Sequence, residues 1–207
     1  MLSGATLAIA LGTLISPGSA ETLDRVAVSV GREVITESQV ILDLRVDAFL
    51  DRTPVDLSSA ARRKSAERLV DQLLILREAV DSHVTLPSTE AATGLVAPYA
   101  AESSYQADLK RYGITEPDLA AHLLAGLRTL TFTDLRFRPD VQVSAEDIRS
   151  YYDKLPHSAA APLPSFEDSR DQIEKLLVEQ RVLDALDQWL AMARSAANIR
   201  YHEKAFE

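Results

Sequence analysis

The sequence predicts a mostly α-helical domain with a small β-sheet that a C-terminal strand completes. Three observations indicate this fold. Residues 26–30 alternate apolar and small or polar side chains, as a half-buried strand does, and Gly31 follows them as a turn residue. Several later segments carry apolar residues every three to four positions, which is the period of an amphipathic helix. Near the end of the chain, Ile199 and Tyr201 again alternate with polar neighbours.

The first strand is expected to belong to a β-hairpin, because apolar residues resume at 34–35 directly after the turn. Thr36 and Gln39 then have the spacing of a capping box, in which each side chain bonds the other residue's backbone N–H. A helix over about 37–50 follows, and Pro54 lies just beyond its end.

The next helix is expected over about 57–82. Its apolar stripe predicts a face that packs on the rest of the domain, and consists of Leu69, Leu73, Leu76 and Val80, widened by Val70 and Leu74. Ser88 is a suitable N-cap for a shorter, Ala-rich helix that passes through Gly94 and Pro98.

In the middle of the chain one helix is expected to end at Gly113, a residue that readily takes the left-handed C′ conformation. The following helix begins after Thr115, with Pro117 in its first turn, and ends near Phe137. Its predicted core stripe comprises Leu119, Leu123, Leu127 and Leu130. A short helix is then expected over 144–152.

The last helix is expected over about 166–196. Its predicted apolar stripe comprises Ile173, Leu176, Leu183, Leu186, Leu190 and Ala193. Ile199 and Tyr201 then form a short strand that can pair with the N-terminal hairpin. The two ends of the chain are therefore expected to close one core.

Composition and charge restrict the function. Hydrophobic residues make up 46% of the 207 residues and charged residues 26%, which indicates a folded chain. The formal net charge of -9 argues against nucleic acid or an anionic membrane surface as the main partner, because both are bound largely through Lys and Arg. The chain has no cysteine, so disulfides, thiolate nucleophiles and cysteine-ligated zinc sites are excluded.

Residues 1–20 are expected to be a signal peptide. They contain no charged side chain, an apolar run extends from Leu2 to Ile15, and the small residues 18–20 precede Glu21. We expect cleavage after Ala20, export, and no stable membrane insertion afterwards. An uncleaved anchor is the alternative, although the apolar run is shorter than the ~20 residues that span a bilayer.

The sequence predicts no catalytic residue, no cofactor and no metal site. It lacks a Gly-x-Ser-x-Gly elbow, a Gly-rich phosphate loop and a dinucleotide fingerprint. The histidines are too far apart in sequence to form a local metal motif: His83, His122, His157 and His202. Acidic pairs such as Glu146 and Asp147 fit solvated helix starts better than a general acid and base.

Aromatic residues make up only 6% of the chain, so their positions are informative. Two interpretations remain open for those between the middle of the chain and residue 152: they pack in the core and at helix junctions, or some of them line a groove that receives extended polypeptide. On the second interpretation the candidate peptide-binding residues are Tyr99, Tyr105, Tyr112, Phe132 and Phe137. Trp189 has the same two interpretations, with packing favoured.

Four motifs occur in an order that carries a family resemblance. They are Val-Ile-Thr-Glu-Ser at 34–38, Leu-Val-Asp-Gln-Leu-Leu at 69–74, Tyr-Gly-Ile-Thr-Glu at 112–116 and Val-Ser-Ala-Glu-Asp-Ile-Arg-Ser-Tyr-Tyr at 143–152. Each motif alone is a cap followed by an amphipathic run. In this order, they resemble the N-terminal domain of SurA-type periplasmic chaperones and their parvulin-linked relatives.

The resemblance implies a domain organisation. Residues 21–154 correspond to the SurA-like N-terminal chaperone region, and residues 166–207 to the helix and strand that close the same core. Residues 155–165 form a Pro- and Ala-rich linker at the place where the relatives carry a parvulin domain. A folded domain needs at least ~50 residues, so no parvulin domain fits there and isomerase activity is not carried over.

The resemblance therefore implies a non-catalytic periplasmic chaperone. Its partners would be unfolded or nascent exported proteins, with outer-membrane proteins as clients, bound through apolar helix faces. Two other functions stay open: an accessory protein of the peptidyl-prolyl isomerase family that acts only with a partner, and a structural periplasmic module.

Overall fold

The computed structural model describes residues 24–156 and 164–207. The expected signal peptide, residues 1–20, lies outside the described residues, and so does most of the linker expected over 155–165. Residues 21–23 of the expected chaperone region also lie outside the described residues.

The mostly α-helical fold with a small sheet is confirmed. The sheet is antiparallel and has the order β2-β1-β3, with β1 at Val26–Val30, β2 at Glu33–Thr36 and β3 at Ile199–Tyr201. Gly31, in the turn between β1 and β2, has a φ of 64°, which favours glycine. The predicted pairing of the last strand with the N-terminal hairpin is therefore correct, and the central strand is the first one in the sequence.

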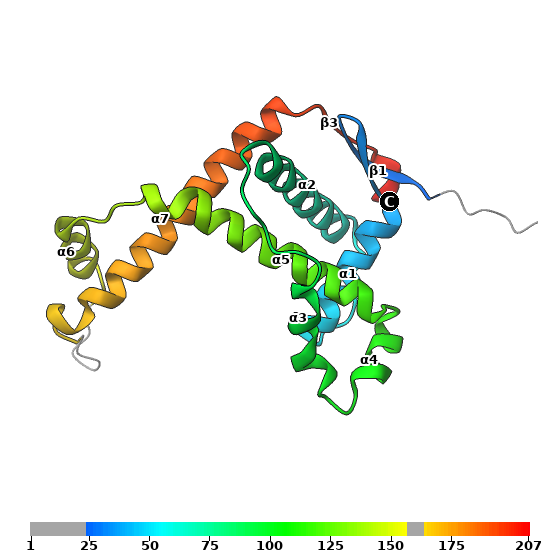
Figure 1. Ribbon diagram of the computed structural model, residues 1–207, viewed down its shortest axis with the longest axis horizontal. Helices are drawn as coiled ribbons and strands as arrows, with labels where there is room; N and C mark the ends of the chain where they lie inside the picture. The colour runs from blue at the N-terminus through cyan, green and yellow to red at the C-terminus, as the bar shows by residue number, and fades with distance from the viewer. Residues whose placement is uncertain (1–23, 157–163) are drawn as a thin grey trace, which may run out of the picture.

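The helices lie on one side of the sheet and extend away from it (Figure 1). In chain order they are α1 (Glu37–Asp51), α2 (Ser59–Asp81), α3 (Ala91–Ala100), α4 (Tyr105–Tyr112), α5 (Glu116–Phe137), α6 (Ala145–Asp153) and α7 (Phe166–Ala196). The sheet lies at one end of the molecule, and α6 with the N-terminal part of α7 lies at the other (Figure 1). Within residues 24–156 and 164–207, no helix has the length and apolar character needed to cross a membrane.

The predicted helix boundaries are set by side-chain caps. Thr36 and Gln39 form the expected capping box, and Thr115 caps α5 in the same way. Gly113 ends α4 in the left-handed conformation, with a φ of 66°. The prediction for Ser88 is wrong: α3 begins at Ala91 without a side-chain cap, because the Ser88 hydroxyl bonds the carboxylate of Glu90 instead.

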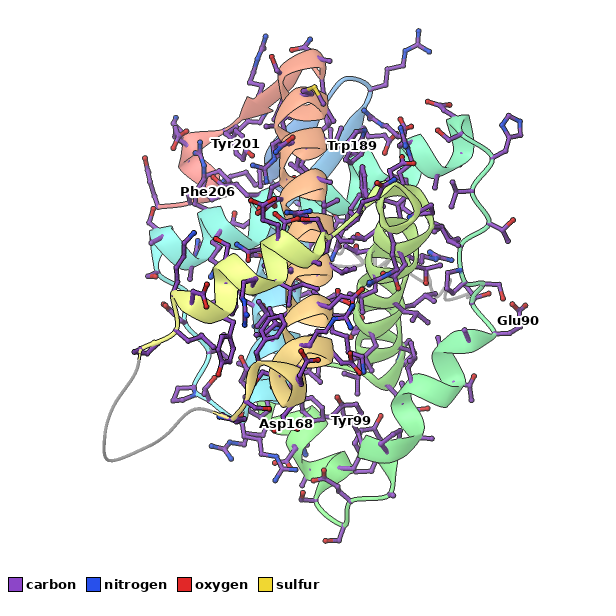
Figure 2. All side chains as sticks on the ribbon, turned by 90° about the vertical axis from the view of Figure 1, so that its left-hand side faces the viewer. Glu90, Tyr99, Asp168, Trp189, Tyr201 and Phe206 are labelled. Carbon is purple, nitrogen blue, oxygen red and sulfur yellow. The ribbon has the colours of Figure 1, made fainter. Side chains whose placement is uncertain are left out.

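Three apolar clusters hold the molecule together. The first joins the sheet to α1, α2 and the C-terminal residues, and Val28, Val70 and Phe206 are buried in it. Figure 2 shows Phe206 and Tyr201 beside the C-terminal end of α7, and their ring centroids are 6.3 Å apart. The second cluster joins α1 to α3, α4 and α5, and the third joins α2, α5 and α7. The N-terminal hairpin and the C-terminal residues therefore share the first cluster.

The predicted stripes are only partly correct, because each long helix packs on different neighbours along its length. In α2, Val70 and Leu74 are buried, but Val80 is 75% exposed and Ile75 and Ala79 are buried in its place. The first half of α2 packs on the sheet and the second half on α5 and α7. The buried face consequently rotates around the helix.

The same correction applies to α5 and α7. Leu119 is buried at the start of α5 as predicted, but Leu130 is 64% exposed, and Phe132 is the buried residue near the end. In α7, Leu186 and Leu190 are buried, whereas Leu176 and Leu183 are exposed and Val182 is buried instead. A single stripe drawn along a whole helix overlooks this change of neighbour.

This burial pattern makes a stability prediction within one helix. We expect Leu190→Ala to lower the free energy of unfolding by about 2–5 kcal/mol, because it removes a buried side chain from the third cluster. Leu183→Ala, at a residue that is 55% exposed, is the matched control and should change it by less than about 1 kcal/mol. Urea denaturation followed by circular dichroism measures both. Equal losses in the two variants would contradict the packing of α7 described here.

Candidate functional site

A cleft of about 420 Å³ lies among β2, α1, α2 and α5. Apolar side chains make up more than half of its lining, and polar or charged side chains make up the rest. The lining residues are Glu33, Val34, Ile35, Gln39, Leu42, Asp43, Val46, Leu69, Gln72, Leu73, Leu76, Asp118, Ala121, His122 and Ala125.

The apolar wall of the cleft is open to solvent. Val34 on β2 is 52% exposed and Leu76 on α2 is 37% exposed. Leu42, Leu69 and Leu73 are half-buried between them. Covering such surface stabilises a complex by about 25 cal/mol per Å² of apolar area, so the cleft can bind an apolar side chain or chain segment.

The wide stripe of α2 explains how one helix supplies both a core face and a cleft wall. Val70 and Leu74 point into the first apolar cluster. Leu69, Leu73 and Leu76 lie at the edge of that stripe, and their side chains line the cleft. The residues predicted as one packing face therefore divide between the protein interior and a solvent-accessible surface.

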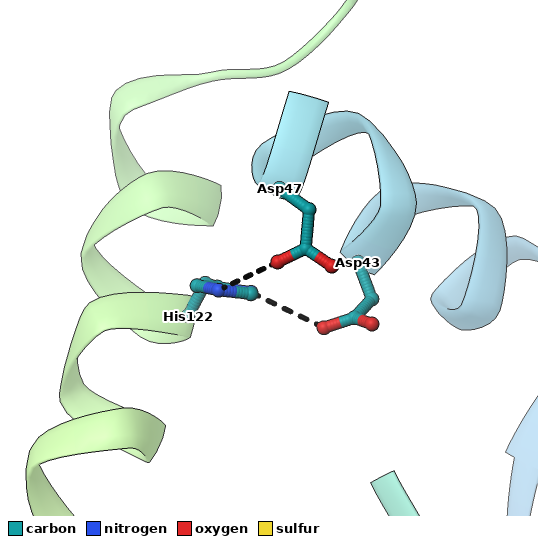
Figure 3. Close-up of side chains that lie close together, drawn as sticks. All are labelled: Asp43, Asp47 and His122. Atoms are coloured by element: carbon teal, nitrogen blue, oxygen red, sulfur yellow. Dashed lines mark ion pairs between the residues drawn. The ribbon is translucent and has the colours of Figure 1, made fainter. Parts of the chain in front are cut away.

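A network of charged and polar side chains borders the cleft through Asp43 and His122. Asp43, only 6% exposed, accepts a 2.6 Å hydrogen bond from the Ser65 hydroxyl on α2. The Arg68 guanidinium, also on α2, donates to the carboxylates of both Asp43 and Asp47. On α5, His122 places Nδ1 3.2 Å from Asp43 Oδ1 and Nε2 3.4 Å from Asp47 Oδ1 (Figure 3). The network thus connects α1 to α2 and to α5.

Asp43 is held in its charged form by these partners. Burial alone would raise the pKa of Asp43, but hydrogen bonds from His122 and Ser65 and the charge of Arg68 outweigh it and lower the pKa below its usual value. The folded state therefore binds the proton at Asp43 less tightly than the unfolded state does.

His122 lies close to both aspartates and thereby connects α5 to both carboxylates on α1.

Asp43, Asp47 and His122 also form the one group of ligating side chains, within the described ranges 24–156 and 164–207, that is close enough to hold a metal ion. Their ligand atoms all lie within 4.8 Å of one another. Arg68 lies against the same two carboxylates, and a bound cation would have to compete with its charge. The arrangement therefore fits an ion-pair network better than a metal site.

Two of the predicted peptide-binding residues lie away from the cleft, in the third apolar cluster. Phe132 is fully buried and Phe137 is 9% exposed. Their rings pack edge to face at 5.9 Å, and Trp189 packs on both, at 5.3 Å from Phe132. Figure 2 shows Trp189 on α7. This position matches the packing interpretation that the sequence left open for these three residues.

The three predicted tyrosines lie together around Phe49 of α1, in a second place that is separate from the cleft. The ring centroids of Tyr99, Tyr105 and Tyr112 lie 6.1, 6.3 and 5.9 Å from that of Phe49. They line a smaller hollow of about 260 Å³. Tyr105 is buried, and the ion pair of Arg52 with Glu102 makes the rim of the hollow polar.

The sequence alone does not predict the network of Asp43, Asp47, Arg68 and His122. One local signal was present: Asp43 and Asp47 have the i, i+4 spacing that puts two side chains on one helix face. Arg68 and His122 come from other helices, and only the tertiary structure brings them to that face.

Comparison of the chain with protein-family models and with curated proteins finds no match. The arrangement of the residues themselves is therefore the basis for assigning a function.

The lowered pKa of Asp43 predicts an acid-dependent part of the stability. Because the folded-state pKa lies below the unfolded value of ~3.9, the contribution of the Asp43 charge is complete above about pH 5 and is lost as the pH falls through the folded-state pKa. We expect Asp43→Asn to destabilise the protein by about 1–3 kcal/mol at pH 7, and by progressively less below pH 4.

Urea unfolding between pH 2.5 and pH 7 measures this difference. Asp47→Asn is the matched control, since Asp47 shares Arg68 and His122 but is more exposed, and its effect should be smaller. A destabilisation by Asp43→Asn that stays constant down to pH 2.5 would contradict the lowered pKa of Asp43 in the folded state.

The position of Arg68 predicts the response to metal ions. We expect equimolar Zn²⁺ or Mn²⁺ to leave the Tm unchanged within about 1 °C, because binding a ligand to the folded state raises its stability only when the affinity is substantial. Differential scanning fluorimetry with and without a chelator tests this. A rise of several degrees that Asp47→Asn abolishes would show that the network is a metal site.

Proposed function

We propose that the protein is a SurA-like chaperone core that binds unfolded exported polypeptides without catalysis. The observation that carries this proposal is the solvent-open apolar cleft among β2, α1, α2 and α5. Unfolded polypeptides expose apolar side chains that folded proteins bury, and an open apolar cleft is suited to hold them.

The chemistry of the cleft suits a binder of low sequence specificity. Its wall consists of aliphatic side chains, among them Val34, Leu73 and Leu76, which adapt to many apolar partners. Gln39 and Gln72 also line it, and a side-chain amide can both donate to and accept from a peptide backbone. Affinity would come from apolar burial, and no nucleotide is required.

The architecture is consistent with the resemblance to SurA-type proteins. The C-terminal strand β3 completes the N-terminal hairpin, as expected for a chaperone core closed by its last segment. The chain passes from α6 to α7 through residues 154–165, a connection too short for a parvulin domain. This supports a holding function over an isomerase function.

The proposed clients are exported proteins, with unfolded outer-membrane β-barrels as the test case. The formal net charge of -9 favours a binder that stays soluble and does not self-associate while carrying apolar surface. The proposed location is the periplasm, reached through the expected signal peptide.

The proposal predicts that the protein suppresses aggregation of an unfolded outer-membrane β-barrel without ATP. Leu76→Ser should raise the amount of protein needed for half-suppression about fivefold, because removing an apolar contact of this size costs ~1 kcal/mol. Light scattering of the diluted client measures suppression.

The matched control is Val80→Ser, which removes an exposed apolar residue one turn further along α2 and outside the cleft. Its suppression should equal that of the unchanged protein. If the unchanged protein gives no suppression at several-fold molar excess, the chaperone proposal fails in favour of an accessory or structural role. Equal losses in both variants would place client binding outside the cleft.

A further inference from the structure

The charged residues that line the cleft share one sign. Apart from His122, they are Glu33 on β2, Asp43 on α1 and Asp118 on α5, and no Lys or Arg belongs to the part of the lining that the structure describes. Three separate elements thus each direct a carboxylate to a wall that is otherwise mostly apolar.

The three carboxylates differ in how far the protein neutralises them. Glu33 pairs with Arg77 at 3.1 Å, and Asp43 pairs with Arg68. Asp118 accepts hydrogen bonds from the backbone and hydroxyl of Thr115, but it forms no ion pair with any residue in the ranges 24–156 and 164–207. The cleft therefore retains negative charge that a bound ligand can neutralise.

We propose that the cleft selects apolar polypeptide segments that carry Lys or Arg, and rejects apolar segments that carry Asp or Glu. This inference rests on the proposed function and specifies the clients of the same cleft. The basis is charge complementarity between a basic segment and an apolar cleft lined by the partly neutralised Glu33 and by Asp118, which forms no ion pair among the described residues.

Basic side chains suit such a site in two ways. The alkyl stems of Lys and Arg cover apolar surface while their charged ends reach polar groups. The charged ends can then meet Asp118 or Glu33 at the edges of the wall. An acidic segment would bring like charges together, and this repulsion adds to the discrimination.

The test uses two synthetic peptides with the same Leu- and Val-rich centre, flanked by Lys in one and by Glu in the other. Fluorescence anisotropy measures their Kd values for the full chain. We expect the Lys-flanked peptide to bind on the order of tenfold more tightly at low salt. Raising the salt to 1 M should reduce this ratio to about two or less, since exposed charges are then screened beyond ~3 Å.

A variant locates the preference in the cleft. Asp118→Asn removes the charge and keeps an oxygen that accepts the Thr115 hydrogen bonds, so it should lower the ratio about threefold. The control is Glu174→Gln on α7, an exposed acidic residue outside the cleft, which should leave the ratio unchanged. Circular dichroism verifies that both variants fold.

The outcomes separate this inference from the proposed function. Equal binding of the two peptides, or tighter binding of the Glu-flanked one, overturns the inference and leaves the proposed function intact. A ratio that falls equally in both variants also overturns it, because the preference then reflects the overall charge. Failure of both peptides to bind, together with no aggregation suppression, overturns the proposed function and with it this inference.

Discussion

The buried carboxylate of Asp43 is the constraint on which the cleft depends. A charge removed from water must be paired and hydrogen-bonded, or it costs several kcal/mol. Ser65 and Arg68 supply partners from α2, and His122 supplies one from α5. Pairing this one group therefore fixes three helices around a common point. Beside this network, Leu69, Leu73 and Leu76 of α2 line the cleft and are at least partly exposed.

Closure of the sheet fixes the remaining elements. β1 lies between β2 and β3. The backbone hydrogen-bonding groups of β1 are therefore paired on both edges only when the C-terminal strand β3 is in place. The pairing of β3 with β1 positions the C-terminal end of α7. There, Trp189 and Leu190 of α7 pack with α2 and with Phe132 of α5. α5 thus contacts α7, the helix that leads into β3, and its His122 contacts Asp43 of α1 beside the cleft. The cleft and the closing strand belong to one packed body.

Local sequence signals predict where most helices and strands lie. Tertiary contacts determine which helix faces are buried and which residues line the cleft. The caps at Thr36, Thr115 and Gly113 depend on residues close in sequence, so the sequence is sufficient to place these helix ends, although not the start of α3. The sides of the helices were predicted less well: Leu76 was expected in a core stripe and lines the cleft instead. Sequence periodicity identifies an apolar face, but it does not reveal whether the face meets another helix or solvent. The association of Asp43 with His122 depends on how α1 packs against α5, which no local pattern encodes.

Photo-crosslinking tests the central claim, binding of unfolded polypeptide in the cleft, most directly. A photoreactive amino acid replaces Val34, an exposed residue of the cleft wall, or Val80, an equally apolar and more exposed residue outside it. After irradiation with an unfolded outer-membrane β-barrel, we expect crosslinks from position 34, few from position 80, and none once the client has folded. Crosslinks of equal yield from both positions, or none from position 34 while aggregation is still suppressed, would contradict the account.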